Sequence, residues 1–105
     1  MTGLEPLVVQ IDQGSNSVLR LVVSGELDIA TAPDLEAAFE QALGTDPHSI
    51  EVDLSQVTFI DSTGIRLLLL ISERGDGRVG LIPGAQVDRV IEITGMRSRL
   101  PLVER

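Results

Sequence analysis

The stretch Thr58-Phe59-Ile60-Asp61-Ser62-Thr63-Gly64 lies where an apolar strand is predicted to end and an apolar helix to begin. The first backbone N–H groups of a helix have no intrahelical partner and the helix dipole is positive there, so a phosphate is tolerated at this end. Because a turn leaves its side chains accessible, a kinase could reach the hydroxyl of Ser62 or Thr63. The same residue types are the commonest helix caps. The stretch therefore predicts either a modification site or a purely structural cap.

The segments on both sides of this stretch predict a parallel βαβ unit. Residues 49–54 alternate between polar and apolar, and residues 57–60 extend the apolar path after a polar interruption at Ser55-Gln56. A helix should run from about residue 62 to residue 74, and a second strand should follow over residues 78–82. Strands joined by a helix in this way are parallel, and the connection is right-handed.

The N-terminal half predicts a β-hairpin followed by a helix. Two β-branched runs, at residues 7–11 and 18–23, are separated by a cluster of turn-forming residues. Thr31 is placed to cap the next helix, Pro33 fits its first turn, and apolar residues then recur with helical spacing from Leu35. The acidic residues just before this helix are expected to lie in a loop.

The C-terminal part predicts one more helix and a short tail. The helix should run from about residue 85 to residue 94 and stop at Gly95, and residues 100–103 form either a short strand or a packed coil. The element order is then β, β, α, β, α, β, α. It predicts a single α/β domain spanning residues 1–105, a sandwich with a mixed sheet and helices mainly on one face.

Five successive apolar residues, Leu67 to Ile71, cover every side of the helix that begins near Ser62. A helix lying on one sheet buries only a stripe of its surface. Either the additional leucines pack against a neighbouring helix, or they leave an apolar patch next to Ser62 for a partner.

Composition excludes several classes of function. The chain has 16 acidic and 8 basic residues and a net charge of −8, and only 2 % of its residues are aromatic, so nucleic-acid binding is disfavoured. It has no cysteine and one histidine, which excludes disulfides and multi-histidine or cysteine metal sites, and no cofactor is expected. No signal peptide or membrane-spanning run is apparent, so we expect a cytoplasmic protein without membrane contact.

Three further patterns are weak. Residues 75–80 match G-x-G-x-x-G, but the glycines follow a predicted helix and lead into a strand, the reverse of the dinucleotide-binding order. A hydrolase triad of Ser62, His48 and Asp61 has no nucleophile-elbow sequence to support it. The acidic pair Glu26 and Asp28 is expected to be solvated. Nothing in the sequence requires catalysis.

The residues around Ser62 resemble the STAS domain of bacterial anti-anti-sigma factors. The resemblance begins with Val52-Asp53-Leu54 and continues through residues 57–64; residues 25–33 are similar to the family's acidic loop, and residues 87–95 to its last helix. It covers nearly the whole chain. It implies a STAS-like fold and a bacterial regulatory protein that is not an enzyme.

The resemblance also implies a partner switch. The unmodified protein would bind an anti-sigma factor that is a serine kinase, releasing a sigma factor; the kinase would phosphorylate Ser62, and a serine phosphatase would reverse the modification. Asp28 and Asp61 match the acidic positions near the family's partner-contacting surface, and we expect Thr63, Gly64 and Arg66 to contact the partner as well. We expect a monomer or weak dimer.

Arg66 departs from the family, which often has a small residue at this position. It lies four positions after Ser62, within reach of a phosphate on that serine. It would pair with the phosphate, alter partner choice, or simply be a solvated arginine. Two other functions remain open for the chain: a non-switching STAS scaffold subunit of a signalling or transport complex, and an enzyme or small-ligand binder that uses Asp61, Ser62 and the acidic loop.

Overall fold

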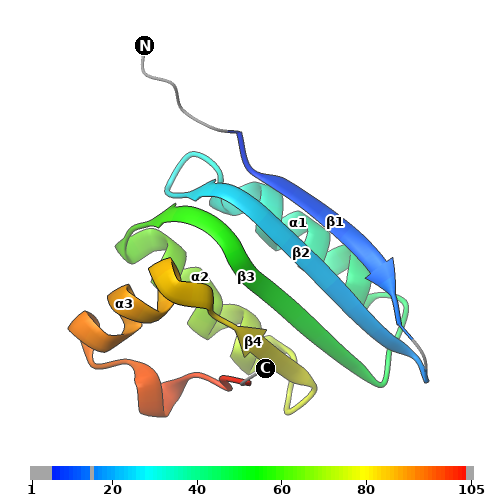
Figure 1. The fold of residues 1–105 in the computed structure, drawn as a ribbon. Coiled ribbons are helices and arrows are strands. Elements are labelled where there is room, and N and C mark those ends of the chain that lie inside the picture. Colours follow the sequence, from blue (N-terminus) through cyan, green and yellow to red (C-terminus); the bar gives the residue numbers. More distant parts are fainter. Residues whose placement is uncertain (1–5, 15, 104–105) are drawn as a thin grey trace.

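A four-stranded mixed sheet forms the centre of the protein, and its strands follow one another in sequence order, β1-β2-β3-β4 (Figure 1). The computed structural model describes residues 6–14 and 16–103. Its elements are β1 (Val8–Gln13), β2 (Val18–Leu27), α1 (Ala32–Leu43), β3 (Ser49–Ile60), α2 (Ser62–Arg74), β4 (Val79–Ile82), α3 (Gly84–Thr94) and a 3-10 turn (Arg97–Arg99). The predicted element order and the α/β fold class are confirmed.

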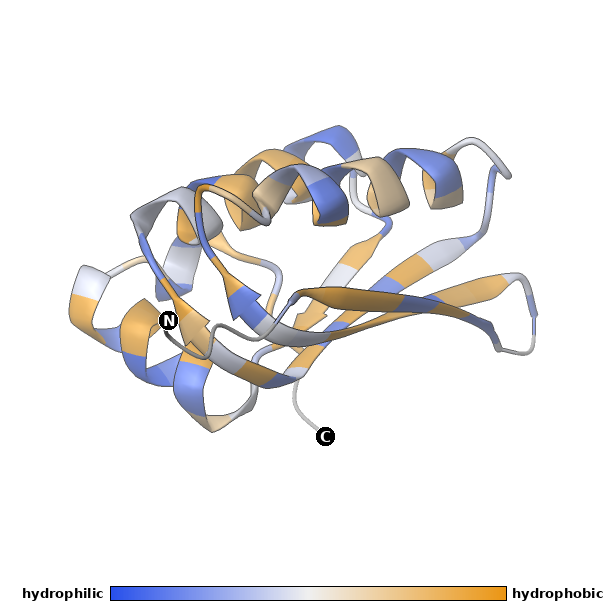
Figure 2. Cartoon of the chain, turned by 90° about the horizontal axis from the view of Figure 1, so that it is seen from above, coloured by the Kyte–Doolittle hydropathy of each residue, from blue (hydrophilic) through white to orange (hydrophobic). Residues whose placement is uncertain are grey.

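Chain direction explains how the helices are distributed. β1 and β2 are antiparallel, as a hairpin requires, whereas β2, β3 and β4 are parallel. Two successive right-handed crossovers that step in the same direction place α1 and α2 on the same face of the sheet. Figure 2 shows these two helices as a layer over one face, with α3 on the other side of the sheet. The fold is therefore a sandwich in which two of these three helices cover one face, as predicted.

Much of the core lies between the sheet and the layer formed by α1 and α2, and α3 adds the buried side chains of Val87 and Ile91 from the other side of the sheet. Along β2 every second residue is buried, and apolar and polar residues alternate along the strands in Figure 2. The largest fully buried side chains are aliphatic apart from Phe39, as the low aromatic content predicted. They are Phe39, Leu21, Leu27, Leu35, Ile50, Leu54, Leu68, Ile71, Leu81, Ile91, Val23 and Val52.

The predicted strand with a polar interruption at Ser55-Gln56 is confirmed, because β3 runs from Ser49 to Ile60 and both residues are exposed within it. The polar pair marks an irregularity in the pairing of β2 with β3, where the register shifts between Val22 and Ser24. A bulge of this kind changes which residues face the core without ending the strand. The expected loop position of Glu26 is corrected, since β2 continues through Leu27.

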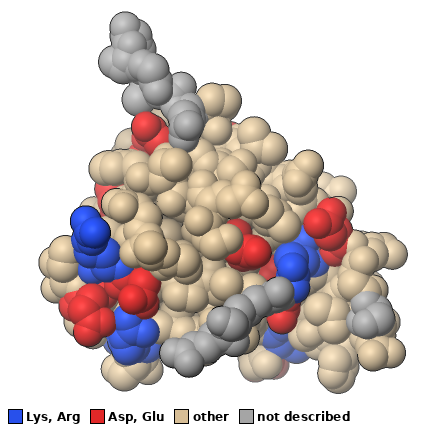
Figure 3. All heavy atoms as spheres, viewed as in Figure 1, with Lys and Arg blue, Asp and Glu red and all other residues tan. Residues whose placement is uncertain are grey.

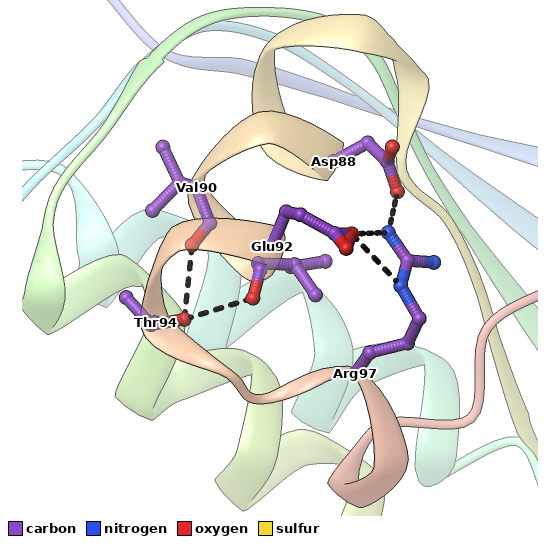
Figure 4. A network of polar contacts seen from close by, with 6 residues as sticks. Asp88, Val90, Glu92, Thr94 and Arg97 are labelled. Atoms are coloured by element: carbon purple, nitrogen blue, oxygen red, sulfur yellow. Dashed lines mark hydrogen bonds and ion pairs between the residues drawn. The ribbon is translucent and has the colours of Figure 1, made fainter.

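The end of α3 is fixed by a polar network around Arg97 (Figure 4). The Arg97 guanidinium donates to Oδ1 of Asp88 and, at 2.9 and 3.2 Å, to Oε1 of Glu92. Hydrogen bonds to these carboxylates, that of Asp88 first, raise the pKa of Arg97 above its usual value. Thr94 Oγ1 donates to the carbonyl oxygens of Val90 and Ile91. The network joins the 3-10 turn to α3.

Beyond the 3-10 turn, the predicted tail lies along β4. The amide of Leu81 donates to the carbonyl oxygen of Pro101 (2.9 Å), and the amide of Val103 donates to that of Leu81 (2.8 Å). Leu102 forms an isolated parallel bridge with Leu81. The tail therefore covers the edge of β4 that faces away from β3.

Charged side chains on the face seen in Figure 1 gather in separate groups with uncharged surface between them (Figure 3). Acidic and basic residues are mixed within these groups. The ion pair of Arg20 with Glu51 (3.0 Å) joins β2 to β3, and Arg97 pairs with two carboxylates near α3. These ion pairs join neighbouring elements of the fold.

Candidate functional site at the start of α2

The loop between β2 and α1 is held by reciprocal hydrogen bonds between Asp28 and Thr31. Oδ1 of Asp28 accepts from the amides of Ala30 (3.0 Å) and Thr31 (3.1 Å). The Thr31 hydroxyl donates to the carbonyl oxygen of Glu26 (2.7 Å) and accepts from the amide of Asp28 (3.0 Å). The expected capping of α1 by the Thr31 side chain is therefore wrong, because the hydroxyl points back to the end of β2.

Of the three candidate caps at the junction between β3 and α2, which are Asp61, Ser62 and Thr63, Asp61 is the N-cap. Asp61 has extended backbone geometry, and its Oδ1 accepts from the amide of Gly64 at 3.0 Å. A cap in this position satisfies one of the unpaired N–H groups of the first turn. Ser62 is exposed and Thr63 is half-buried. The structural requirement for a cap is thus met without either hydroxyl.

The two loops are in direct contact. The amide of Asp61 donates to the carbonyl oxygen of Leu27 at 3.3 Å, so the start of α2 rests on the end of β2. A methyl group added at Gly64 would lie 2.6 Å from Cγ1 of Ile60 and 3.0 Å from the same Leu27 oxygen. Gly64 is buried, and its lack of a side chain permits this close packing. The acidic loop and the serine therefore lie at the same end of the sheet.

An apolar groove lies beside Ser62, between α1 and α2. It has a volume of about 260 Å³ and is lined by Ile29 and Pro33 on one side and by Thr63, Arg66 and Leu70 on the other. The side chain of Ile29 is 75 % exposed and that of Leu70 is 40 % exposed. Exposed apolar residues in a groove with a polar rim are typical of a protein-binding surface.

The apolar run of α2 is mostly buried, and one of its five residues is exposed. Leu67, Leu68 and Ile71 are buried against the core, and Leu69 is half-buried. Leu70 alone of the five is exposed, and it lines the groove. The two helices are also joined by Arg74, which pairs with Glu40 and, at 3.9 Å, with Glu36.

The structure brings Asp28, Asp61, Thr63, Gly64 and Arg66 to one end of the molecule. Asp28 and Asp61 are half-buried, whereas Arg66 is exposed. Sequence reasoning missed Ile29 as a candidate. The available signal was an apolar isoleucine in the loop directly before α1. The residues that face Ile29 across the groove belong to α2, so the sequence near Ile29 does not reveal the groove.

The alternative sites are not assembled. His48 is exposed and precedes β3, whereas Ser62 follows it, so the twelve-residue strand separates them by roughly 35 to 40 Å. Residues 75–80 connect α2 to β4, in the order that disfavours dinucleotide binding. Among residues 6–14 and 16–103, no three His, Asp or Glu side chains cluster as a metal site requires. In this same part of the chain, no helix is long and apolar enough to cross a membrane.

Loss of the Asp61 cap is expected to destabilise the fold modestly. Asp61→Ala leaves the Gly64 amide without its acceptor, and removal of a helix cap costs about 1 kcal/mol of unfolding free energy. Asp61→Asn keeps an oxygen acceptor and should lose much less. Urea unfolding of the two variants compares them directly, and equal stabilities would show that the hydrogen bond to Gly64 contributes nothing.

Known structures share this fold. An anti-sigma factor antagonist from Mycobacterium paratuberculosis superposes with a TM-score of 0.81 at 30 % identity, covering 91 % of this chain and 84 % of that one. The anti-sigma factor antagonist SpoIIAA in its unphosphorylated form gives 0.70 at 20 % identity, covering 93 % and 88 %. The phosphorylated form of SpoIIAA from Bacillus gives 0.66. The fold is therefore SpoIIAA-like.

The sequence defines the family. Residues 11–104 match the family model described as "Mlab, STAS domain", and the chain belongs to the STAS domain family. The anti-sigma-F factor antagonist RsfB of Mycobacterium tuberculosis is 37 % identical over 59 residues, which are 56 % of this chain and 48 % of RsfB. The aligned part thus spans about half the length of that relative.

Proposed function

We propose that this chain is an anti-sigma factor antagonist whose binding is switched off by phosphorylation of Ser62. The proposal rests on one observation, that the cap of α2 and the exposed hydroxyl at its start belong to different residues. Asp61 supplies the cap through Gly64, so the exposed Ser62 hydroxyl is left for modification. The names of the relatives support antagonism of an anti-sigma factor.

In the proposed cycle, the unmodified protein binds an anti-sigma factor that is a serine kinase, and a sigma factor is released. The kinase transfers the γ-phosphoryl group of ATP to Oγ of Ser62, leaving ADP and a proton. A separate serine phosphatase hydrolyses the phosphoserine. The phosphate lies at the positive end of α2 and displaces no cap, so the fold should persist in both states.

The proposed partner surface is the α1–α2 groove together with the loops beside it. In the groove, Ile29 and Leu70 offer apolar area and Arg66 offers a charge. Asp28 and Asp61 offer carboxylates in the loops at this end of the sheet. Thr63 lines the groove next to the serine. Gly64 contributes to this surface indirectly, because its lack of a side chain lets the start of α2 pack closely against the end of β2. A complex on this surface would place a phosphate on Ser62 at the rim of the interface.

Intact mass spectrometry after incubation with ATP and candidate anti-sigma kinases tests this proposal. Wild type should gain one phosphate, and Ser62→Ala should gain none. Thr63→Val controls for modification of the neighbouring hydroxyl and should behave as wild type. A phosphate retained by Ser62→Ala and lost from Thr63→Val would move the modification site to Thr63.

The scaffold alternative gives a different result in the same experiment. A non-switching STAS subunit would gain no phosphate and would bind its partner tightly whether or not ATP is present. That outcome, with Ser62→Ala and wild type binding equally, would replace the switch with a permanent contact.

Changing Leu70 to aspartate is expected to weaken binding of the anti-sigma partner about tenfold, because a charge would be buried in an apolar contact. A tenfold loss of affinity corresponds to about 1.4 kcal/mol of binding free energy. Leu70 is already 40 % exposed, so the fold should be retained. Ile93→Asp is the matched control, since Ile93 is 77 % exposed and lies on α3, on the other face of the sheet. Titration calorimetry measures both, and equal affinities would remove the groove from the interface.

A further inference from the structure

The arginines of this protein fall into two groups. Four are engaged in ion pairs with carboxylates: Arg20, Arg74, Arg78 and Arg97. Within residues 6–14 and 16–103, Arg66, Arg89 and Arg99 have no ion pair. Of these three, only Arg66 lies on α2. It is exposed and lies at the edge of the groove beside Ser62.

Helix geometry brings the Arg66 side chain toward Ser62. The two residues are four positions apart on α2, so their Cβ atoms are neighbours on the same side of the helix, about 5 to 6 Å apart. Each Cα–Cβ bond in a helix tilts toward the N-terminus, so the long side chain of Arg66 extends in the direction of the serine. Both residues are exposed.

We propose that Arg66 is the intramolecular ligand of the phosphate on Ser62. This inference rests on the proposed function and adds a second part to the switch. A guanidinium binds a phosphate through two parallel N–H···O bonds, which a lysine cannot reproduce. Pairing would move the guanidinium from the edge of the groove to the phosphate. Phosphorylation would then change the partner surface twice, by adding an anion and by withdrawing a cation.

The other charged groups near the start of α2 are acidic. Asp61 precedes Ser62, and its carboxylate already accepts from Gly64. Asp28 lies in the adjacent loop, and Glu36 of α1 lines the same groove while pairing with Arg74 at 3.9 Å. These carboxylates disfavour the doubly charged phosphate and raise its pKa, whereas Arg66 favours that form and lowers it. The two effects can therefore be separated by substitution of Arg66.

The test measures the pKa of the phosphoserine by ³¹P NMR at low ionic strength. Phosphoserine is incorporated at position 62 during translation, so the protein is fully modified without a kinase. Arg66→Gln should raise the pKa of the phosphate by about 0.3 or more, a twofold or larger change in its proton affinity. Arg66→Lys should give an intermediate value. Arg89→Gln, the matched control on α3, should equal wild type.

Equal phosphate pKa values in wild type and Arg66→Gln would overturn the proposal, because a pairing cation must lower that pKa. A second readout is the ¹⁵N shift of the Arg66 Nε–H, which should change when Ser62 is phosphorylated and should not change in the unmodified protein over the same pH range. Neither measurement involves a kinase. The NMR measurements therefore test the pairing of Arg66 with the phosphate separately from phosphorylation by a kinase. The mass spectrometry experiment tests phosphorylation with Arg66 intact.

Discussion

Phosphorylation of Ser62 is expected to lower the affinity of this protein for its anti-sigma partner about a hundredfold. The modification adds a charge of about −1.5 to −2 next to Asp61, at the rim of the proposed interface. The partner would have to desolvate this anion and face the carboxylates of Asp28 and Asp61 as well. A loss of about 3 kcal/mol of binding free energy corresponds to this change in affinity.

Titration calorimetry with the unmodified and fully phosphorylated protein measures this effect. Ser62→Ala should bind as the unmodified protein does, and Ser62→Asp, with less charge than a phosphate, should lie between the two states. Unfolding curves should be similar in all four, since Asp61 keeps its hydrogen bond to Gly64. Equal partner affinity for all four proteins would remove Ser62 from the mechanism.

Truncation of Leu68 is expected to be the most destabilising change on α2. The side chain is fully buried in the core, and Leu→Ala at such a site costs about 2 to 5 kcal/mol through lost transfer free energy and the cavity that remains. A domain of this size is stable by only about 5 to 15 kcal/mol. Leu68→Ala should therefore lose a large part of the stability of the fold.

Leu70→Ala is the control, because it makes the same chemical change two positions away on the same helix. Leu70 is 40 % exposed, so less apolar area is lost and no closed cavity forms. We expect a loss of less than about 1 kcal/mol. Urea unfolding measures both free energies. A similar loss at the two positions would contradict the assignment of Leu70 to the surface.

The sequence by itself determined the elements and their order. The spacing of apolar residues from Leu35 onward and the alternation over residues 49–54 depend on local periodicity, which a single chain carries in full. The junction at Asp61 was also visible, because strand end, cap and helix start are consecutive. Ser62 could be singled out for the same reason, although local sequence could not say which of three residues was the cap.

Only the tertiary structure decided how separate segments meet. The register of β3 against β2 shifts between Val22 and Ser24, which depends on how the two strands pair. The Thr31 hydroxyl turns away from α1 because the end of β2 offers it an acceptor. The groove exists because the crossovers set α1 beside α2, bringing Ile29 and Leu70 together from distant parts of the chain. Periodicity assigns a residue to a face of its own element, but the partner of that face is chosen by packing.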